Sequence, residues 1–130
     1  MNIYSAINYG SKILKSKLIP NSQLDSEILM AKIIQKDRRY ILLNSNELIN
    51  ENDLNNFNKL IEQRSLGNPV AYLTNKKFFW NSEFFVTNET LIPRPDTELV
   101  VENILNLTKQ KNKINILDIG VGSGCILLSI

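Results

Sequence analysis

The 130-residue sequence contains no histidine and only one cysteine, Cys125. Without histidine, the chain has no imidazole base and no His-containing zinc site. A single cysteine excludes an internal disulfide and a cysteine cluster for metal, so we expect no metal site. No stretch approaches the ~20 apolar residues of a membrane span, and the N-terminus lacks the basic start and apolar run of a signal peptide. A cytoplasmic protein without a membrane partner is therefore expected.

Charge of one sign is also scarce. The net charge is +2 at pH 7 and the lysines are scattered along the chain. The sequence therefore lacks the overall basic field that drives nucleic-acid binding, and we expect no direct nucleic-acid partner. Apolar residues make up 43% of the chain and charged residues 22%. These proportions are close to those of soluble globular proteins, and the length suits about one domain.

The first third of the chain has helical periodicity. Apolar residues recur at three- and four-residue steps over residues 2–18, and Pro20 closes this segment. A second apolar pattern at helical spacing covers residues 24–34. Ser22 followed by Asp25 resembles a capping box with Asp in place of the usual Glu. Two amphipathic helices are therefore predicted.

Two further helical segments follow. A short helix is predicted around Tyr40–Leu43. A longer helix, capped by Asn50 or Asn52, carries apolar residues inward and stops at Gly67. Residues 1–73 are therefore predicted to form a small helical bundle.

The period changes from helical to extended at Lys76. Two aromatic runs, Phe78–Trp80 and Glu83–Val86, flank Asn81-Ser82 and predict a β-hairpin within residues 74–95. The aromatic side chains could form a stacking platform for bases. Hairpin core is the favoured interpretation, because alternate side chains of a strand must pack against something.

The segment Pro93–Glu98 has two open interpretations. In the structural one, its prolines fix extended backbone, Asp96 or Thr97 caps a helix that ends near residue 107, and Glu98 favours the positive helix end. In the functional one, the segment is a rigid pocket wall and Arg94 offers a planar donor fork to a carboxylate or carbonyl. The candidate wall residues are Pro93, Arg94, Pro95, Asp96 and Glu98.

A buried strand is predicted at Ile114–Ile119, followed by a glycine turn and by a helix that begins near Cys125. The turn lacks the spacing of a dinucleotide fingerprint and the lysine of a phosphate loop. An acid two residues before the turn can pair with a ligand's ammonium or other cation, which favours S-adenosylmethionine; another nucleotide and a ligand-free structural turn stay open. The candidate cofactor-binding residues are Asp118, Gly120, Val121, Gly122, Ser123 and Gly124.

The predicted strand, turn and helix form half of a βαβ unit. A lone strand of the parallel type has no neighbour with which to pair its backbone groups. We therefore expect the chain to be incomplete and its last ~35 residues to be poorly anchored.

The sequence closely resembles the HemK/PrmC family, the glutamine N5-methyltransferases of peptide-chain release factors. The resemblance covers the whole chain in order, and its most specific part is the string Leu-Ile-Pro-Arg-Pro-Asp-Thr-Glu. Its quoted segments are Gly67–Thr74, Phe79-Trp80, Phe85-Val86, Leu91–Glu98 and Ile116–Gly124. The resemblance implies an α/β protein with three parts. These are an all-α substrate-recognition domain at 1–73, a β-hairpin linker at 74–95 and the start of a Rossmann-like S-adenosylmethionine-dependent methyltransferase domain at 96–130.

The resemblance also implies methyl transfer to the glutamine amide of the Gly-Gly-Gln motif in release factors. Residues 120–124 would hold the cofactor, Asp118 would support that loop, and the bundle would grip the release factor. Val121 stands where the family usually carries a small hydroxyl residue. The family's Asn-Pro-Pro-Tyr substrate clamp does not occur in the sequence. No catalytic residue is therefore assigned, and these 130 residues alone are predicted to be inactive.

Two other functions stay open. The chain could be a non-catalytic helical protein-binding module, or it could belong to an enzyme that methylates amino groups of nucleic-acid bases. The weak overall charge and the Leu-Ile-Pro-Arg-Pro-Asp-Thr-Glu string argue against the second.

Overall fold

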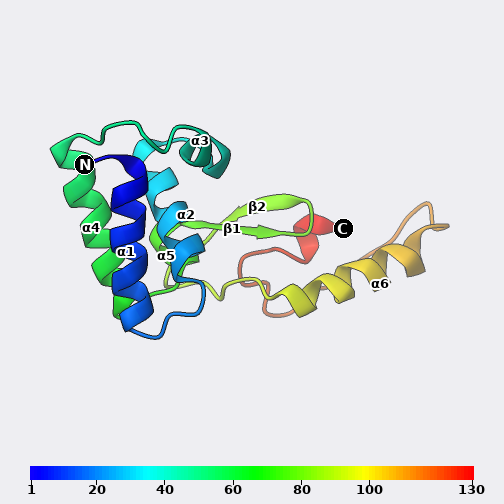
Figure 1. Cartoon of the computed structure of the whole chain (residues 1–130). Coiled ribbons are helices and arrows are strands. Elements are labelled where there is room, and N and C mark those ends of the chain that lie inside the picture. Colours follow the sequence, from blue (N-terminus) through cyan, green and yellow to red (C-terminus); the bar gives the residue numbers. More distant parts are fainter. The chain divides into compact units, whose positions relative to one another are not determined.

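A computed structural model describes all residues from Met1 to Ile130, which divide into two compact units, Met1–Thr74 and Asn75–Ile130. The first unit consists of α1 (Ile3–Ser16), α2 (Ser22–Ile34), α3 (Arg38–Leu43), α4 (Glu51–Ser65) and α5 (Val70–Thr74) (Figure 1). The second consists of β1 (Lys76–Phe79), β2 (Ser82–Phe85), the 3-10 helix η1 (Pro95–Thr97), α6 (Glu98–Thr108) and the 3-10 helix η2 (Leu127–Ser129). Helices with one antiparallel hairpin are consistent with the α/β prediction, whereas the Rossmann-like start stays a prediction.

Side-chain caps set several helix ends in the first unit. Asn2 caps α1 and Asp37 caps α3, each by accepting a hydrogen bond from a backbone N–H three residues later. Asn50, one of the two predicted caps, accepts from the backbone N–H of Asp53 at 2.8 Å. Gly67 follows the end of α4 with φ of +98°, as the predicted helix stop requires. Helix α5 follows Pro69 and was not predicted.

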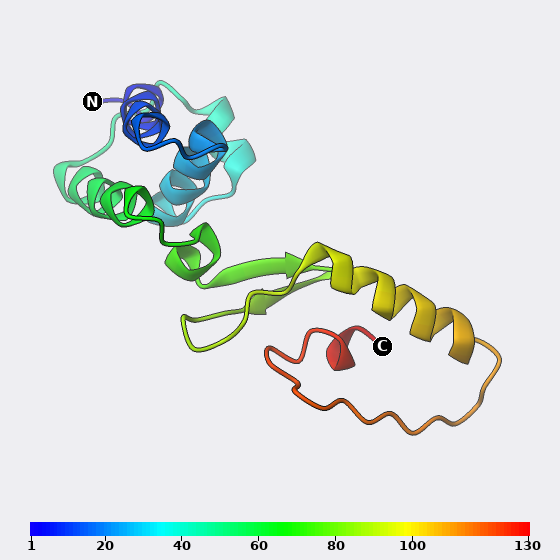
Figure 2. The ribbon, with the colours of Figure 1, turned by 90° about the horizontal axis from the view of Figure 1, so that it is seen from below.

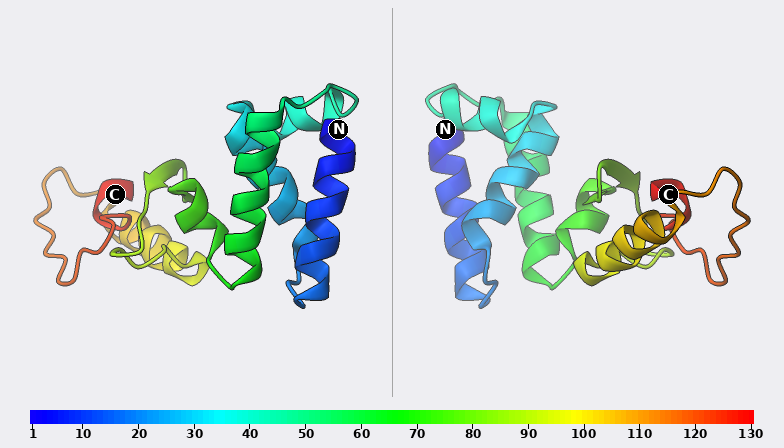
Figure 3. Two further views of the ribbon diagram at one scale, coloured as in Figure 1. Left: turned by 90° about the vertical axis from the view of Figure 1, so that its left-hand side faces the viewer. Right: turned by 90° about the vertical axis from the view of Figure 1, so that its right-hand side faces the viewer.

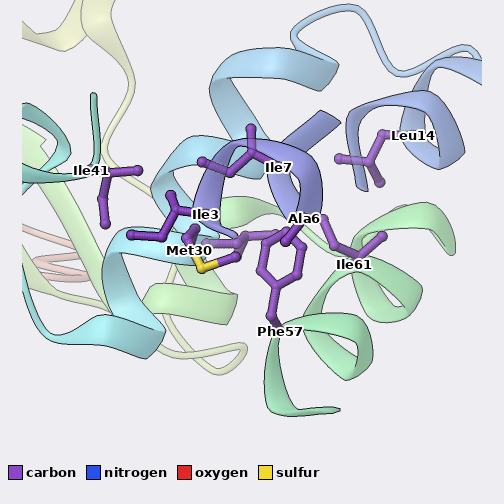
Figure 4. Close-up of a cluster of buried hydrophobic side chains, with 9 residues drawn as sticks. Ile3, Ala6, Ile7, Leu14, Met30, Ile41, Phe57 and Ile61 are labelled. Atoms are coloured by element: carbon purple, nitrogen blue, oxygen red, sulfur yellow. The ribbon is translucent and has the colours of Figure 1, made fainter. Parts of the chain in front are cut away.

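Three helices, α1, α2 and α4, run alongside one another and enclose the core of the first unit (Figure 3). Phe57 of α4 is completely buried among side chains from α1 and α2 (Figure 4). Helix α3 adds Ile41 to this core. The buried residues of the cluster are Ile3, Ala6, Ile7, Leu14, Leu29, Met30, Ile41, Phe57 and Ile61.

The buried face of α2 differs from the predicted one. Ser22 is the first helical residue and makes no capping bond, and Asp25 points to Arg64 of α4 instead of closing a box. The predicted capping box is therefore wrong. Polar residues occupy much of the buried face, whereas Leu24, predicted to lie inward, is 40% exposed. The buried polar residues of α2 are Ser22, Asp25, Ser26 and Glu27.

Each of these carboxylates is matched by a cation. Asp25 Oδ2 accepts from Arg64 Nε at 2.7 Å, and Arg64 also donates to the carbonyl of Asn68 after α4. Glu27 accepts from Arg38 Nε of α3 and from Gln23 Nε2. Because buried charges are stable only when paired, α2 is held to its neighbours by electrostatic as well as apolar contacts.

The predicted hairpin forms, with its turn one residue earlier than expected. Phe79 pairs with Ser82, so Trp80 and Asn81 form the two-residue turn. Phe79 and Phe84 face inward and pack edge to face, with ring centroids 6.0 Å apart. Phe78 and Phe85 lie on the opposite face and are exposed, so core packing accounts for Phe79 and Phe84 but not for these two rings.

The predicted strand at Ile114–Ile119 does not form. These residues have no regular secondary structure, and apart from Asp118 they are exposed (Figure 2). The physical reason is pairing: β1 and β2 bond to each other and neither bonds to this segment. The predicted helix from Cys125 is reduced to the three residues of η2. No helix in either unit is both long and apolar enough to cross a bilayer.

Candidate functional site

The glycine loop, residues 120–124, adopts a backbone that only glycine takes readily. Gly120, Gly122 and Gly124 have φ of +85°, +56° and +75°, while Val121 and Ser123 between them are not in the left-handed region. A Cβ added at Gly120 would meet no atom within 4 Å, and one added at Gly122 would meet only a backbone oxygen at 3.8 Å. The turn therefore has open space beside Gly120 and Gly122, whereas a Cβ at Gly124 would lie 3.3 Å from Leu128 Cδ1.

The backbone donors of this loop are largely unused. The only bond that closes the turn runs from Gly124 N to the Val121 carbonyl at 2.8 Å. The N–H groups of residues 120–123 donate no hydrogen bond within the chain. Successive N–H groups in a backbone that alternates in this way form a concavity for negatively charged groups.

Asp118 lies two residues before Gly120 in the chain. Its Oδ2 atom is buried and has no hydrogen-bond partner. A buried carboxylate oxygen without a partner is unfavourable unless a ligand supplies the donor. Ser129 Oγ, which follows the loop in the sequence, is the second buried side-chain oxygen without a partner.

The end of the glycine loop is held by apolar packing. Cys125, which follows Gly124, is buried with Phe79 and Phe84 of the hairpin and Val101 of α6. Trp80, Leu105 and Ile126 pack against this group, which we call the hairpin cluster. Cys125 is thus a buried free thiol, and it lies in a turn instead of at the start of the predicted helix.

The Pro93–Glu98 segment follows the structural interpretation in part: Thr97 stands at the N-cap position of α6 and Glu98 is the first residue of that helix. Neither Asp96 nor Thr97 caps through its side chain, because η1 replaces a sharp helix start and makes the first turn with backbone bonds. The predicted side-chain cap is therefore wrong. Arg94 and Asp96 are exposed, while Pro93 is buried. Glu98 accepts a hydrogen bond from the backbone N–H of Trp80 at 2.9 Å.

No hydrogen bond or ion pair joins Pro93–Glu98 to the glycine loop. The assignment of both segments to one site therefore stays a prediction. Trp80, predicted to end the first strand, instead takes a φ of +53° in the hairpin turn. The predicted turn, Asn81-Ser82, placed Trp80 in the first strand, and no local pattern marks a bulky residue for the left-handed region. No group of acidic or cysteine side chains in the structure could hold a metal ion.

A family model described as the PrmC N-terminal domain matches residues 5–74. The matched region is more than half of the chain and coincides with the five-helix unit. The chain belongs to the PrmC N-terminal domain family. The resemblance drawn from the sequence is thereby confirmed.

Relatives extend the likeness into the second unit. The release factor glutamine methyltransferase of Leptospira interrogans is 40% identical over 130 residues, which cover 99% of this chain and 46% of that protein. The enzyme of the same name from Buchnera aphidicola subsp. Baizongia pistaciae is 38% identical and is covered to 47%. A bifunctional methyltransferase of Rickettsia typhi is 32% identical over 147 residues and is covered to 28%. The chain thus spans about half the length of the first two relatives, and both of its units align with them.

Proposed function

We propose that this chain is part of an S-adenosylmethionine-dependent methyltransferase that modifies the glutamine side-chain amide of the Gly-Gly-Gln motif in peptide-chain release factors. The names of the relatives support the reaction class and the substrate. The observation that carries the cofactor assignment is the glycine loop with its free backbone donors beside the unpartnered oxygen of Asp118.

The amino-acid end of S-adenosylmethionine is chemically complementary to this loop. Its ammonium suits the Asp118 carboxylate, and its carboxylate suits the N–H groups of residues 120–123. The open space beside Gly120 and Gly122 permits close approach of a ligand to the backbone. When bound, the cofactor supplies a methyl group on a sulfonium, and this chain's residues hold its amino-acid end.

The remaining parts take the roles that the family resemblance implies. Residues 1–73 bind the release factor, residues 74–95 connect the parts, and residues 96–130 begin the methyltransferase domain. A glutamine amide is a poor nucleophile and must be oriented for in-line attack. No Asn-Pro-Pro-Tyr clamp stands in this sequence to do so. The 130 residues alone are therefore proposed to bind without catalysing.

Substitution of Gly122 tests the cofactor site. We expect the chain to bind S-adenosylmethionine and Gly122→Ala to bind it about tenfold more weakly. A side chain in left-handed backbone costs roughly 1–2 kcal/mol, and the new methyl group fills the open space beside the backbone. Isothermal titration calorimetry measures both affinities. Gly67→Ala is the matched control, since Gly67 also has positive φ and open space but lies in the helical unit. Equal weakening by both variants, or no binding by the wild-type chain, would contradict the assignment.

A binding assay with a release factor tests the partner and separates the alternatives. The chain should retain a release factor in a pull-down and transfer no methyl group to it from labelled S-adenosylmethionine. Retention without cofactor binding would favour the non-catalytic binding module. Strong RNA binding that falls steeply with salt would favour the nucleic-acid base methyltransferase. Methyl transfer above background would refute the proposed inactivity of these residues.

A further inference from the structure

The hairpin turn has an uncommon backbone and an uncommon support. Trp80, its first residue, has φ of +53°, a region that bulky residues rarely occupy. The N–H of this residue donates to the Glu98 carboxylate, 18 positions later in the chain, at 2.9 Å. A hydrogen bond to an ionised acceptor is about twice as strong as a neutral one. The first residue of α6 therefore stabilises a turn that is intrinsically strained.

The same turn is linked by side-chain packing to the end of the glycine loop. Trp80 packs against the hairpin cluster, whose buried members include Cys125. Cys125 follows Gly124 directly, and the loop's own closing bond is the single one from Gly124 to Val121. Together with the bond from Leu128 N to the Gly124 carbonyl at 2.9 Å, the hairpin cluster therefore positions the end of the loop, and the turn that Glu98 supports belongs to the same hairpin.

We infer that Glu98 is a positioning residue of the methyltransferase: it fixes the hairpin turn and, through the hairpin cluster, the end of the glycine loop. This inference rests on the proposed function only in taking the glycine loop as the cofactor site. Glu98 itself acts through the Trp80 amide and makes no hydrogen bond or ion pair with the loop. The hairpin, on this view, is part of the framework of the cofactor site.

The chain contains its own probe for this role, because Cys125 is its only cysteine and is 8% exposed. Its thiol reacts with an aromatic disulfide such as DTNB, forming a mixed disulfide and releasing the coloured thiolate, only when the cluster opens. Loss of a hydrogen bond to a charged group should raise that opening about tenfold. Glu98→Ala is therefore expected to accelerate labelling of Cys125 by about tenfold.

Two variants make this test specific. Glu98→Gln keeps an acceptor oxygen for the Trp80 N–H, so its labelling rate should lie within about threefold of wild type. Glu102→Ala removes an exposed carboxylate one turn later on α6, where it has no partner, and should leave the rate unchanged. An unchanged rate in Glu98→Ala would overturn the inference. If Glu98→Ala loses its helical circular dichroism signal, Glu98→Gln decides: the wild-type rate supports the inference and an accelerated rate overturns it.

Cofactor affinity separates this inference from the function on which it rests. We expect Glu98→Ala to bind S-adenosylmethionine about tenfold more weakly than wild type, and Glu98→Gln to bind it nearly as well. If wild type and Glu98→Ala bind equally, the inference fails and the proposed function stands. If wild type binds no cofactor while Cys125 labelling responds as expected, the proposed function fails and the mechanical link between Glu98 and the loop stands.

Discussion

Replacing Arg64 with alanine is expected to lower the free energy of unfolding of the helical unit by about 3 kcal/mol. The side chain of Arg64 is 16% exposed and that of Asp25 is 10% exposed. Arg64, whose Nε lies 2.7 Å from Asp25 Oδ2, is the only hydrogen-bond partner of the Asp25 carboxylate. Arg64→Ala leaves a charged group buried without compensation, and it also removes the bond to the Asn68 carbonyl. Urea unfolding followed by circular dichroism measures the loss as a lower midpoint with an unchanged slope.

Arg38→Ala is the matched control for this prediction. Arg38 also pairs with a buried carboxylate of α2, but its own side chain is 51% exposed, and Glu27 retains the bond from Gln23. We expect a loss of about 1 kcal/mol or less. The double variant Asp25→Ala/Arg64→Ala should be more stable than Arg64→Ala, because it leaves no unpaired charge. Equal losses in Arg38→Ala and Arg64→Ala would show that burial does not determine the value of these pairs.

The helical unit could be predicted from the sequence because its helices carry local signals. Asn50 is followed by a polar first turn and an apolar period, and Gly67 marks the end of the same helix. The inward face of α2 could not be predicted in the same way. Asp25 and Ser26 face inward because partners 39 and 19 positions away in the chain satisfy them, and no local pattern reports such pairing.

At the glycine loop, the sequence predicted a turn but not what surrounds it. The structure adds that Gly120, Gly122 and Gly124 each take a left-handed backbone there. The strand predicted before them depends on a neighbour for its hydrogen bonds, and β1 and β2 leave none available to it. An acidic residue is favourable at a helix N-terminus, and this local role was sufficient to explain Glu98 in the sequence. Its hydrogen bond to the Trp80 N–H, 18 positions away, could therefore not be predicted.

The tight packing of α1 against two helices at Gly10 predicts the second large effect. Gly10 of α1 is buried, and a Cβ placed there would lie 2.6 Å from Ser26 Oγ of α2 and 2.8 Å from Ile61 Cδ1 of α4. Gly10→Leu must therefore push α1 away from two helices at once, and we expect it to lower the free energy of unfolding by about 3 kcal/mol. Lys12→Leu, at an exposed position of the same helix, is the control and should change stability by less than about 0.5 kcal/mol.

Gly10→Ala identifies which neighbour resists the added side chain. Alanine gains about 1 kcal/mol of helix propensity over glycine. It must also displace the Ser26 hydroxyl, which donates to the Ile7 carbonyl at 3.1 Å in a fully buried position, and an unpaired group there costs about 1–3 kcal/mol. A net loss of about 1 kcal/mol is expected in wild type and none in a Ser26→Ala background, where the displaced hydroxyl is absent. Equal losses of stability in both backgrounds would instead show that Ile61 of α4 resists the added methyl group, so that the contact between α1 and α4 requires glycine at this position.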